Sequence, residues 1–455
     1  MKRSYLLNLS HLFDRLSPFQ IIVLFYISAV MISTLLVSLP FLHTDGATIS
    51  FIDCLFTAVS AVSVTGLTVV PTESTFNTGG YFVIMFILQF GGIGIMTLGT
   101  FIWMLMGKKI GLKRRQLIKT DQNRTTFSGL VRLIRQILII VIAIEVVGAI
   151  VLGIYFTEYF PTIGEAFVQG MFASVSATTN AGFDITGSSL VMFEHDYFVQ
   201  FVNMLLLTLG AIGFPVLIEV KDYLTKKPGD FFNFSLFTKL TSTTFGALVL
   251  VGAIAIYFFD RTHFFADKSW HESLFYSLFQ SVTTRNGGLA TMDVSEFSIP
   301  TLLVISVLMF IGASPSSVGG GIRTTTFAIM IISIVAYARG KSRVRIFKRE
   351  IDTEDIFRSF IVINTAIIIC GISIIFLNVL EPQFTLIQVA FEACSAFGTT
   401  GLSMGITPDL HTAGKLIIIA LMFIGRIGIF SFLFIIRGKV TKDNYRYPKE
   451  AVIIG

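Results

Sequence analysis

One arrangement of apolar segments recurs four times along this chain and limits what it can fold into. A long apolar run is followed by a polar turn, then by a half-length apolar segment that ends at a glycine, and then by a second long run. The glycines recur at intervals of about 110 residues, which is the signature of a repeated structural unit. The half-length segments read FIDCLFTAVSAVSVTGL (51–67), IGEAFVQGMFASVSATTNAGF (163–183), SWHESLFYSLFQSVTTRNGGL (269–289) and FTLIQVAFEACSAFGTTGL (384–402).

The long runs have the length of membrane-spanning helices. Residues 19–42, 81–106 and 133–156 each supply the roughly 20 apolar residues that cross the hydrocarbon core of a bilayer. Only 14% of the residues are charged, whereas soluble domains carry about 25%. The chain is therefore predicted to be an all-α polytopic membrane protein.

The basic residues are distributed unevenly between the two sides of the predicted spans. Most of the 34 Lys and Arg residues lie in the N-terminus and in the segments 108–135, 221–239, 339–349 and 437–449. Because basic loops stay in the cytoplasm, this asymmetry places both termini there, in a cell-membrane protein with many spans. The net charge of +6 is explained by topology and does not call for nucleic-acid binding.

The repeats and the charge distribution together predict an architecture. Each repeat begins and ends in the cytoplasm, so the four copies are parallel and related by an axis along the membrane normal. We expect eight full spans and four re-entrant half-length helices, in pseudo-four-fold symmetry around a central pore. The predicted segments are the cytoplasmic N-terminus 1–18, repeat one 19–107, a basic loop 108–129, repeat two 130–225, a loop 226–236, repeat three 237–340, a basic loop 341–354, repeat four 355–438 and the cytoplasmic tail 439–455.

The four glycine turns are the candidate functional feature. Non-helical backbone is tolerated at membrane depth only where it is buried in protein or lines a watery cavity. Glycine allows successive carbonyl groups to point inward, and a ring of carbonyl oxygens can replace the hydration shell of a cation. A single loop of this kind could also be a re-entrant packing element in which glycine allows close contact. Four equivalent loops at matching positions of the repeats favour a selectivity filter. The predicted ion-binding residues are Val64, Thr65, Gly66, Leu67, Asn180, Ala181, Gly182, Phe183, Asn286, Gly287, Gly288, Leu289, Thr399, Thr400, Gly401 and Leu402.

Several motifs resemble the superfamily of Trk, Ktr and HKT potassium transporters over nearly the whole chain. The resemblance implies four M1-P-M2 repeats and bacterial potassium uptake. The chain starts directly with repeat one and is most similar to the Ktr-type membrane subunit, although Leu289 stands where many relatives have Phe. The matching motifs are VTGL (64–67), TNAGF (179–183), RNGGL (285–289), TTGL (399–402), FGGIGIMTL (90–98), GASPSSVGGGIRTTTF (312–327) and FIGRIGIF (423–430).

The second long run of repeat three is interrupted by a polar, glycine-rich insert. The resemblance implies an intramembrane gate at this insert, with Arg426 as an electrostatic barrier below the filter. A passive kink is an alternative, and a phosphate-binding loop is disfavoured because neither a preceding strand nor a following Lys-Ser/Thr pair is present. The predicted gate consists of Gly312, Ala313, Ser314, Pro315, Ser316, Ser317, Val318, Gly319, Gly320, Gly321 and Arg426.

Other charged residues are predicted at membrane depth. Arg426 is placed in the middle of a span, where an arginine is costly; a structural role in bonding helix carbonyls is the alternative to the barrier. Arg285 is expected to brace the filter from behind. Glu145 and Glu219 are expected to act as counterions whose partners the sequence does not identify.

The resemblance also implies partners. The basic stretches 108–115 and 338–350 are expected to dock onto a cytosolic nucleotide-binding RCK ring of the KtrA/KtrC type, or to contact anionic lipids. The tail is expected at a homodimer interface. No cofactor is expected in this chain: K⁺ is the transported ion, Na⁺ is a possible activator, and the nucleotide belongs to the partner.

Two other functions are alternatives to potassium uptake. A sodium-preferring or poorly selective transporter of the same fold is the first alternative. A polytopic membrane enzyme is disfavoured, because the nearest pair of candidate catalytic groups, His271 and Glu272, lies in a predicted outer loop beside a half-length helix.

Overall fold

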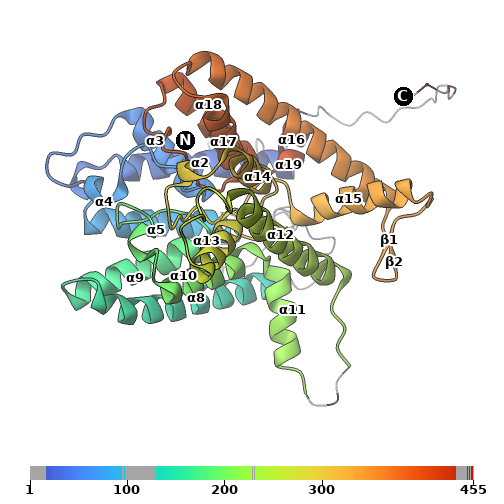
Figure 1. Ribbon diagram of the computed structural model, residues 1–455, viewed down its shortest axis with the longest axis horizontal. Helices are drawn as coiled ribbons and strands as arrows, with labels where there is room; N and C mark the ends of the chain where they lie inside the picture. The colour runs from blue at the N-terminus through green and yellow to red at the C-terminus, as the bar shows by residue number, and fades with distance from the viewer. Residues whose placement is uncertain are drawn as a thin grey trace, which may run out of the picture.

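The computed structural model describes residues 17–94, 97, 130–227, 229, 231–436, 448, 450 and 452–453. The predicted N-terminus up to residue 16, the basic loop 108–129 and most of the predicted tail lie outside the described residues. The described part is mainly helical, with one short antiparallel hairpin that Figure 1 shows projecting beyond the end of α15. Its minor elements are η1 (Pro40–Leu42), α4 (Thr72–Thr75), η2 (Phe156–Glu158), η3 (Val191–Phe193), η4 (Val294–Glu296), β1 (Arg345–Ile346) and β2 (Arg349–Glu350).

Four helices of the described part are long and apolar enough to cross a membrane, and each opens one of the predicted repeats. The N-cap side chains Ser17, Ser235 and Asp352 accept hydrogen bonds from backbone N–H groups in the first turns of three of them, which satisfies donors that the helix itself leaves unpaired. The four helices are α2 (Pro18–Val37), α8 (Leu130–Tyr155), α12 (Leu236–Asp260) and α16 (Thr353–Leu380).

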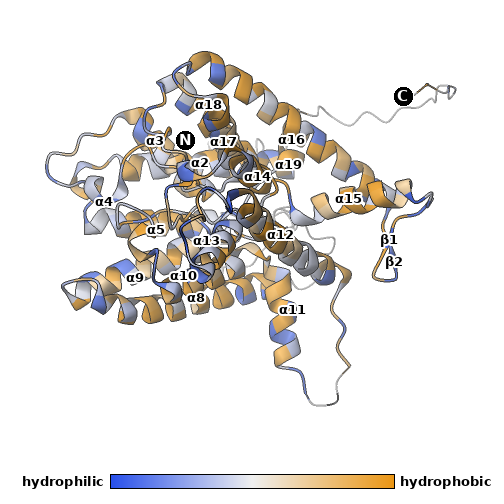
Figure 2. Cartoon of the chain, in the orientation of Figure 1, coloured by the Kyte–Doolittle hydropathy of each residue, from blue (hydrophilic) through white to orange (hydrophobic). Residues whose placement is uncertain are grey.

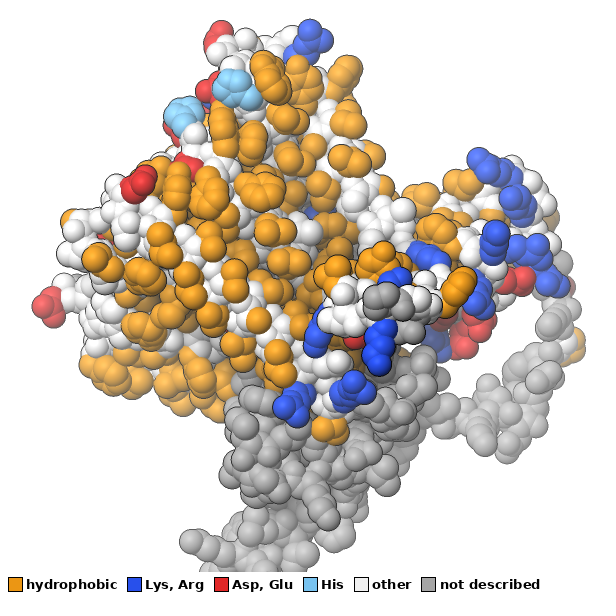
Figure 3. All heavy atoms as spheres, turned by 90° about the horizontal axis from the view of Figure 1, so that it is seen from below, with side chains coloured by type: hydrophobic (Ala, Val, Ile, Leu, Met, Phe, Trp, Pro, Cys, Tyr) orange, Lys and Arg blue, Asp and Glu red, His pale blue; other side chains and the backbone are white. Residues whose placement is uncertain are grey.

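Large apolar side chains cover the outside of the bundle. On α12, the exposed fractions of Val251, Ile254 and Phe258 are 62%, 67% and 71%. Figure 2 shows hydrophobic residues along the long helices, and Figure 3 shows apolar side chains over much of one face. In the same view, most Lys and Arg side chains gather at one end and the His side chains at the other. Such a continuous apolar surface suits contact with lipid rather than with water.

The four half-length segments form separate helices, as the sequence predicts. They contain between 13 and 16 residues, which at about 1.5 Å per residue is too short for a hydrocarbon core of about 30 Å. Each starts after a Ser or Thr N-cap, namely Ser50, Thr162, Ser269 or Thr385. The helices are α3 (Phe51–Ser63), α9 (Ile163–Thr178), α13 (Trp270–Thr283) and α17 (Leu386–Gly398).

The second spans differ from the uninterrupted helices that the sequence predicts for repeats two and four. In repeat two the chain bends by 104° between α10 (Tyr197–Ala211) and α11 (Phe214–Leu224), and in repeat four by 101° between α18 (Thr412–Ile427) and α19 (Ile429–Ile436). If each bent pair is one span, the described part has up to six.

Glycines explain both bends. Gly213 and Gly428 have φ values of 103° and 82°, which other residues rarely adopt and which end the regular helical hydrogen bonding. Gly94, which follows α5 (Thr78–Ile93), has a φ of 93°. In repeat three, α14 (Ile299–Phe310) and α15 (Thr324–Ala338) are separated by the predicted insert.

The first and fourth repeats pack against each other. One buried apolar cluster joins side chains of α2, α3 and α5 to side chains of α16, α17 and α18. Phe56, Phe76 and Phe397 are each at most 1% exposed within it. The first and the fourth predicted repeats therefore meet in space, as a closed arrangement of four repeats requires.

Candidate functional site

The glycine turns that end the four half-length helices form a closed ring. Each glycine lies against the next turn, and the last lies against the first. A Cβ built on each glycine would lie too close to its neighbour: Gly66 2.5 Å from the Ala181 carbonyl oxygen, Gly182 2.9 Å from the Gly288 Cα, Gly288 2.5 Å from the Thr400 carbonyl oxygen and Gly401 3.0 Å from the Gly66 Cα. No larger residue fits these positions without displacing backbone.

In each turn, the carbonyl group at one equivalent position faces the ring glycine of an adjacent turn. It belongs to the residue immediately before the ring glycine, that is Thr65, Ala181, Gly287 or Thr400. Within the described part of the chain, these four oxygens accept no hydrogen bond. The ring therefore presents one unpaired backbone acceptor from every repeat.

The four turns also share an uncommon backbone conformation. The residue two positions before each ring glycine is left-handed, with φ values of 57° at Val64, 53° at Asn180, 70° at Asn286 and 53° at Thr399. This conformation is unfavourable for most side chains, and especially for the β-branched Val and Thr. Such strain persists where the surrounding structure imposes it, and it clusters at functional sites.

Side-chain amides connect successive turns. The Asn180 amide donates to the Arg285 carbonyl oxygen at 3.2 Å, which joins the second turn to the third. The Asn286 amide donates to the Thr399 carbonyl oxygen at 3.1 Å and to its hydroxyl at 2.9 Å, which joins the third turn to the fourth. These bonds fix the turns relative to one another.

Hydroxyl groups of the half-length helices hold the turns from behind. The Ser60 and Ser395 hydroxyls accept from the backbone N–H groups of Gly66 and Gly401, each at 3.1 Å. Ser176 donates to the Phe183 carbonyl oxygen at 2.6 Å. These three serines were missed in the sequence, although a Ser stands six residues before the ring glycine in three repeats.

The third turn is held in a related way. The Thr283 hydroxyl donates to the Leu289 carbonyl oxygen at 2.6 Å. The carbonyl oxygens of Phe183 and Leu289 are thus bonded to the helices behind the ring, unlike the oxygens of the residues before the glycines.

The predicted gate insert lies directly beside the ring. The Gly320 N–H donates to the Thr399 hydroxyl at 2.9 Å, and a Cβ on Gly319 would lie 2.5 Å from Asn286 Cγ. The backbone of the insert also bonds to the breaks in the second spans of repeats two and four: Ser314 N–H to Ala211 O at 3.1 Å, Phe214 N–H to Ser316 O at 2.8 Å, and Gly321 N–H to Gly425 O at 3.2 Å.

Arg426 lies next to the bend that interrupts the second long apolar run of repeat four. It occupies the last turn of α18, just before the bend at Gly428. Its Nε donates to the Tyr26 hydroxyl at 2.8 Å and its Nη2 donates to the Gly91 carbonyl oxygen. The Tyr26 hydroxyl in turn donates to the Val62 carbonyl oxygen at 3.2 Å. Arg426 thus connects α18 to the end of the first half-length helix.

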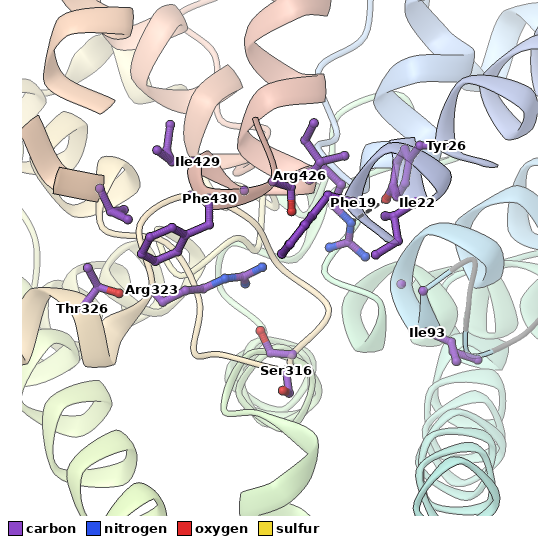
Figure 4. A pocket seen from close by; sticks show the side chains of 18 residues that line it. Phe19, Ile22, Tyr26, Ile93, Ser316, Arg323, Thr326, Arg426, Ile429 and Phe430 are labelled. Carbon is purple, nitrogen blue, oxygen red and sulfur yellow. Dashed lines mark hydrogen bonds between the residues drawn. The ribbon is translucent and has the colours of Figure 1, made fainter. Parts of the chain in front are cut away.

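A cavity of about 140 Å³ lies between Arg426 and the insert. Figure 4 shows Arg323 and Arg426 approaching it from different segments, with Ser316 also at its edge. Arg323 donates to the Gly319 carbonyl oxygen and to the Ser314 carbonyl oxygen, the latter at 3.4 Å. Two guanidinium groups therefore line one small cavity.

Arg285 is almost completely buried behind the third turn, with 1% of its surface exposed. Its Nη2 donates to the carbonyl oxygen of Leu308, near the end of α14. The guanidinium group thereby satisfies a carbonyl group that the end of the helix leaves unpaired. It links the third turn to the helix that precedes the insert.

The other predicted polar residues have local partners. Glu145 accepts from the Gln89 amide at 2.7 Å, and Glu219 accepts from the Ser235 N–H at 3.0 Å; within the described residues, neither forms a salt bridge. Glu272 belongs to the capping box of α13, and His271 contacts the Tyr197 hydroxyl at 2.7 Å. The pair His271 and Glu272 therefore has ordinary helix-end and loop roles.

Comparison with known proteins identifies the family. Residues 10–446 match the family model described as TrkH, cation transport protein. The chain belongs to the TrkH family. This confirms the membership that the motifs indicated, and it is a family of cation transporters rather than of enzymes.

Relatives within the TrkH family match over almost the whole chain. The Ktr system potassium uptake protein D of Bacillus subtilis is 56% identical over 99% of this chain and 100% of its own length. The potassium/sodium uptake protein NtpJ of Enterococcus hirae is 34% identical over 97% of this chain and 98% of its own length. The crystal structure of the potassium transporter TrkH from Vibrio parahaemolyticus has a TM-score of 0.71 at 18% identity, covering 93% of this chain and 86% of that one. The mostly helical membrane fold is therefore shared.

Proposed function

We propose that this TrkH-family chain is the membrane subunit of a bacterial potassium uptake system and that K⁺ passes through the ring of four turns. The observation that carries the proposal is the set of four unpaired carbonyl oxygens, at Thr65, Ala181, Gly287 and Thr400, around four mutually packed glycines. Such a ring replaces water around a dehydrated cation. The four half-length helices also direct their C-terminal ends, which favour cations, toward the ring.

The four repeats then correspond to M1-P-M2 units. In this proposal α2, α8, α12 and α16 are the first spans, the half-length helices are the pore helices, and the helices after the turns form the second spans. The second spans in this proposal are α5 in repeat one, the bent pair α10 and α11 in repeat two, the pair α14 and α15 on either side of the insert in repeat three, and the bent pair α18 and α19 in repeat four.

The insert 312–321 is the proposed gate of this pathway. It lies beside the third and fourth turns and is held by backbone hydrogen bonds to the break between α10 and α11 and to the end of α18. Arg426 and Arg323 add two positive charges to the cavity at the insert, and these raise the energy of a cation that leaves the ring on that side. Displacement of the insert would open the ion pathway.

We propose that the gate is regulated through the basic segment that contains the β1–β2 hairpin. The hairpin segment carries the exposed residues Arg343, Arg345, Lys348 and Arg349, and it follows α15, which begins just after the insert. A cytosolic RCK ring that binds there would act on the gate through α15, with its nucleotide held in the ring. The proposal further includes a homodimer of this chain, contact of its basic segments with anionic lipids, and activation of transport by Na⁺.

A sodium-preferring or poorly selective transporter is the second candidate, favoured by the similarity to the potassium/sodium uptake protein of Enterococcus hirae. Uptake of K⁺ into liposomes containing the purified chain, with and without excess Na⁺, separates the two. Potassium uptake that resists competition by Na⁺ supports the first. Equal or greater uptake of Na⁺ overturns it in favour of the second.

A further inference from the structure

One half-length helix carries a buried carboxyl group behind its turn. Glu392 of α17 is 1% exposed and stands nine residues before the ring glycine Gly401. The corresponding residues of the other three half-length helices are Thr57, Ala173 and Phe279. The group is therefore specific to the fourth repeat, and the common architecture of the turns does not require it.

The Glu392 carboxyl binds the loop that leaves the fourth turn. The Thr407 hydroxyl donates to its Oε1, and the Ser403 hydroxyl lies 3.0 Å from the Thr407 hydroxyl. The Ser403 hydroxyl accepts from the Gly405 N–H at 3.0 Å. Because Ser403 follows Leu402 directly, these bonds fold the exit loop 403–407 back onto the helix from which the turn emerges.

The exit loops of the second and third turns are held differently. They bond to each other, with Leu190 N–H donating to the Ala290 carbonyl oxygen at 3.0 Å and Ala290 N–H donating to the Ser189 hydroxyl at 3.0 Å. The fourth exit loop is attached to its own half-length helix through Glu392. The fourth turn is thus held from behind by Ser395 and on its exit side by Glu392.

The carboxyl group is also incompletely satisfied. Its Oε2 is buried and has no hydrogen-bond partner within the described part of the chain. A buried acceptor without a partner is unfavourable, and such exceptions call for an explanation. A packing role alone would be served better by an apolar side chain of similar size.

We propose that Glu392 is a positioning residue for ion discrimination. By holding Thr407 and the exit loop, it fixes the fourth turn at the spacing that suits K⁺, so that the loss of this bond lowers the preference for K⁺ over Na⁺. The inference rests on the proposed function, because it requires the ring to select the ion.

Thr407→Val and Glu392→Leu test the inference, since both remove the hydrogen bond while keeping most of the side-chain volume. The ratio of K⁺ to Na⁺ uptake in liposomes is expected to fall by about three- to tenfold in both variants, the range that corresponds to the loss of one hydrogen bond. Glu392→Gln keeps an acceptor for Thr407 and is expected to retain a ratio near that of the unsubstituted chain. Thr57→Val, at the matching position of the first half-length helix, is the control and should leave the ratio unchanged.

An unchanged uptake ratio in folded Thr407→Val overturns the inference, even if the melting temperature falls. A merely structural role predicts a lower melting temperature without a change in the uptake ratio. An equal loss in Glu392→Gln and Glu392→Leu also contradicts it. Gly66→Ser, measured in the same assay, separates this inference from the proposed function. If Gly66→Ser alters the ratio and Thr407→Val does not, only the role of Glu392 fails; if Gly66→Ser has no effect, the ring is not the filter.

Discussion

The Lys415 ammonium donates to the Asp53 carboxylate at 2.8 Å. Asp53 lies in the first turn of α3 and Lys415 lies in the first turn of α18, so the bond joins the first repeat to the fourth. Their side chains are only 18% and 12% exposed. This contact closes the arrangement of repeats on the side where the half-length helices begin.

Removing the cation of this pair should destabilise the fold. Lys415→Met leaves the Asp53 carboxylate mostly buried with only its Ser50 partner, and the free energy of unfolding is expected to fall by about 1–3 kcal/mol. Thermal melting in detergent measures this, with exposed Lys341→Met as the control. A double-mutant cycle with Asp53→Asn should show coupling between the two sites; strictly additive effects would mean that the pair contributes nothing.

The Asn286 amide is expected to hold the third and fourth turns together. Asn286→Ala removes both bonds to Thr399, so potassium uptake should fall and the melting temperature should decrease. The matched control is Asn364→Ala, because the Asn364 amide bonds to the Phe360 carbonyl oxygen of its own helix. Equal uptake by the two variants would show that the bonds between turns are dispensable.

Shortening the insert tests the gate. Deleting part of 316–320 removes the bond from Phe214 N–H to Ser316 O and the contact of Gly320 with Thr399. Flux without any regulatory partner should rise while the preference for K⁺ is retained. Background flux in a correctly folded deletion variant would show that the insert is structural support.

The two proposed roles of Arg426, electrostatic barrier and structural support, can be separated by substitution. Arg426→Ala removes both the charge and the bonds to Tyr26 and Gly91, whereas Tyr26→Phe removes the bond from Arg426 and the bond to the Val62 carbonyl oxygen but keeps the charge. If the charge limits conduction, Arg426→Ala should increase maximal uptake with little change in apparent affinity, and Tyr26→Phe should not. Slower uptake together with a lower melting temperature in Arg426→Ala would instead identify it as a brace for helix carbonyl groups.

The sequence predicted the half-length helices because their length and their final glycines are local features that recur four times. It did not predict the bends at Gly213 and Gly428, because glycines within apolar runs are also common in straight membrane helices. The serines behind the turns were visible in the spacing, whereas the pairing of Asp53 with Lys415 depends on contact between residues 362 positions apart.

The central claim is that all four glycine turns line one ion path, and the ratio of K⁺ to Na⁺ uptake tests it most directly. Gly66→Ala, Gly182→Ala, Gly288→Ala and Gly401→Ala should each be measured in liposomes beside Gly246→Ala, whose added Cβ meets no atom within 4 Å. The account predicts that every ring substitution lowers the ratio while the control leaves it unchanged. A folded ring variant that keeps the ratio of the unsubstituted chain would contradict it.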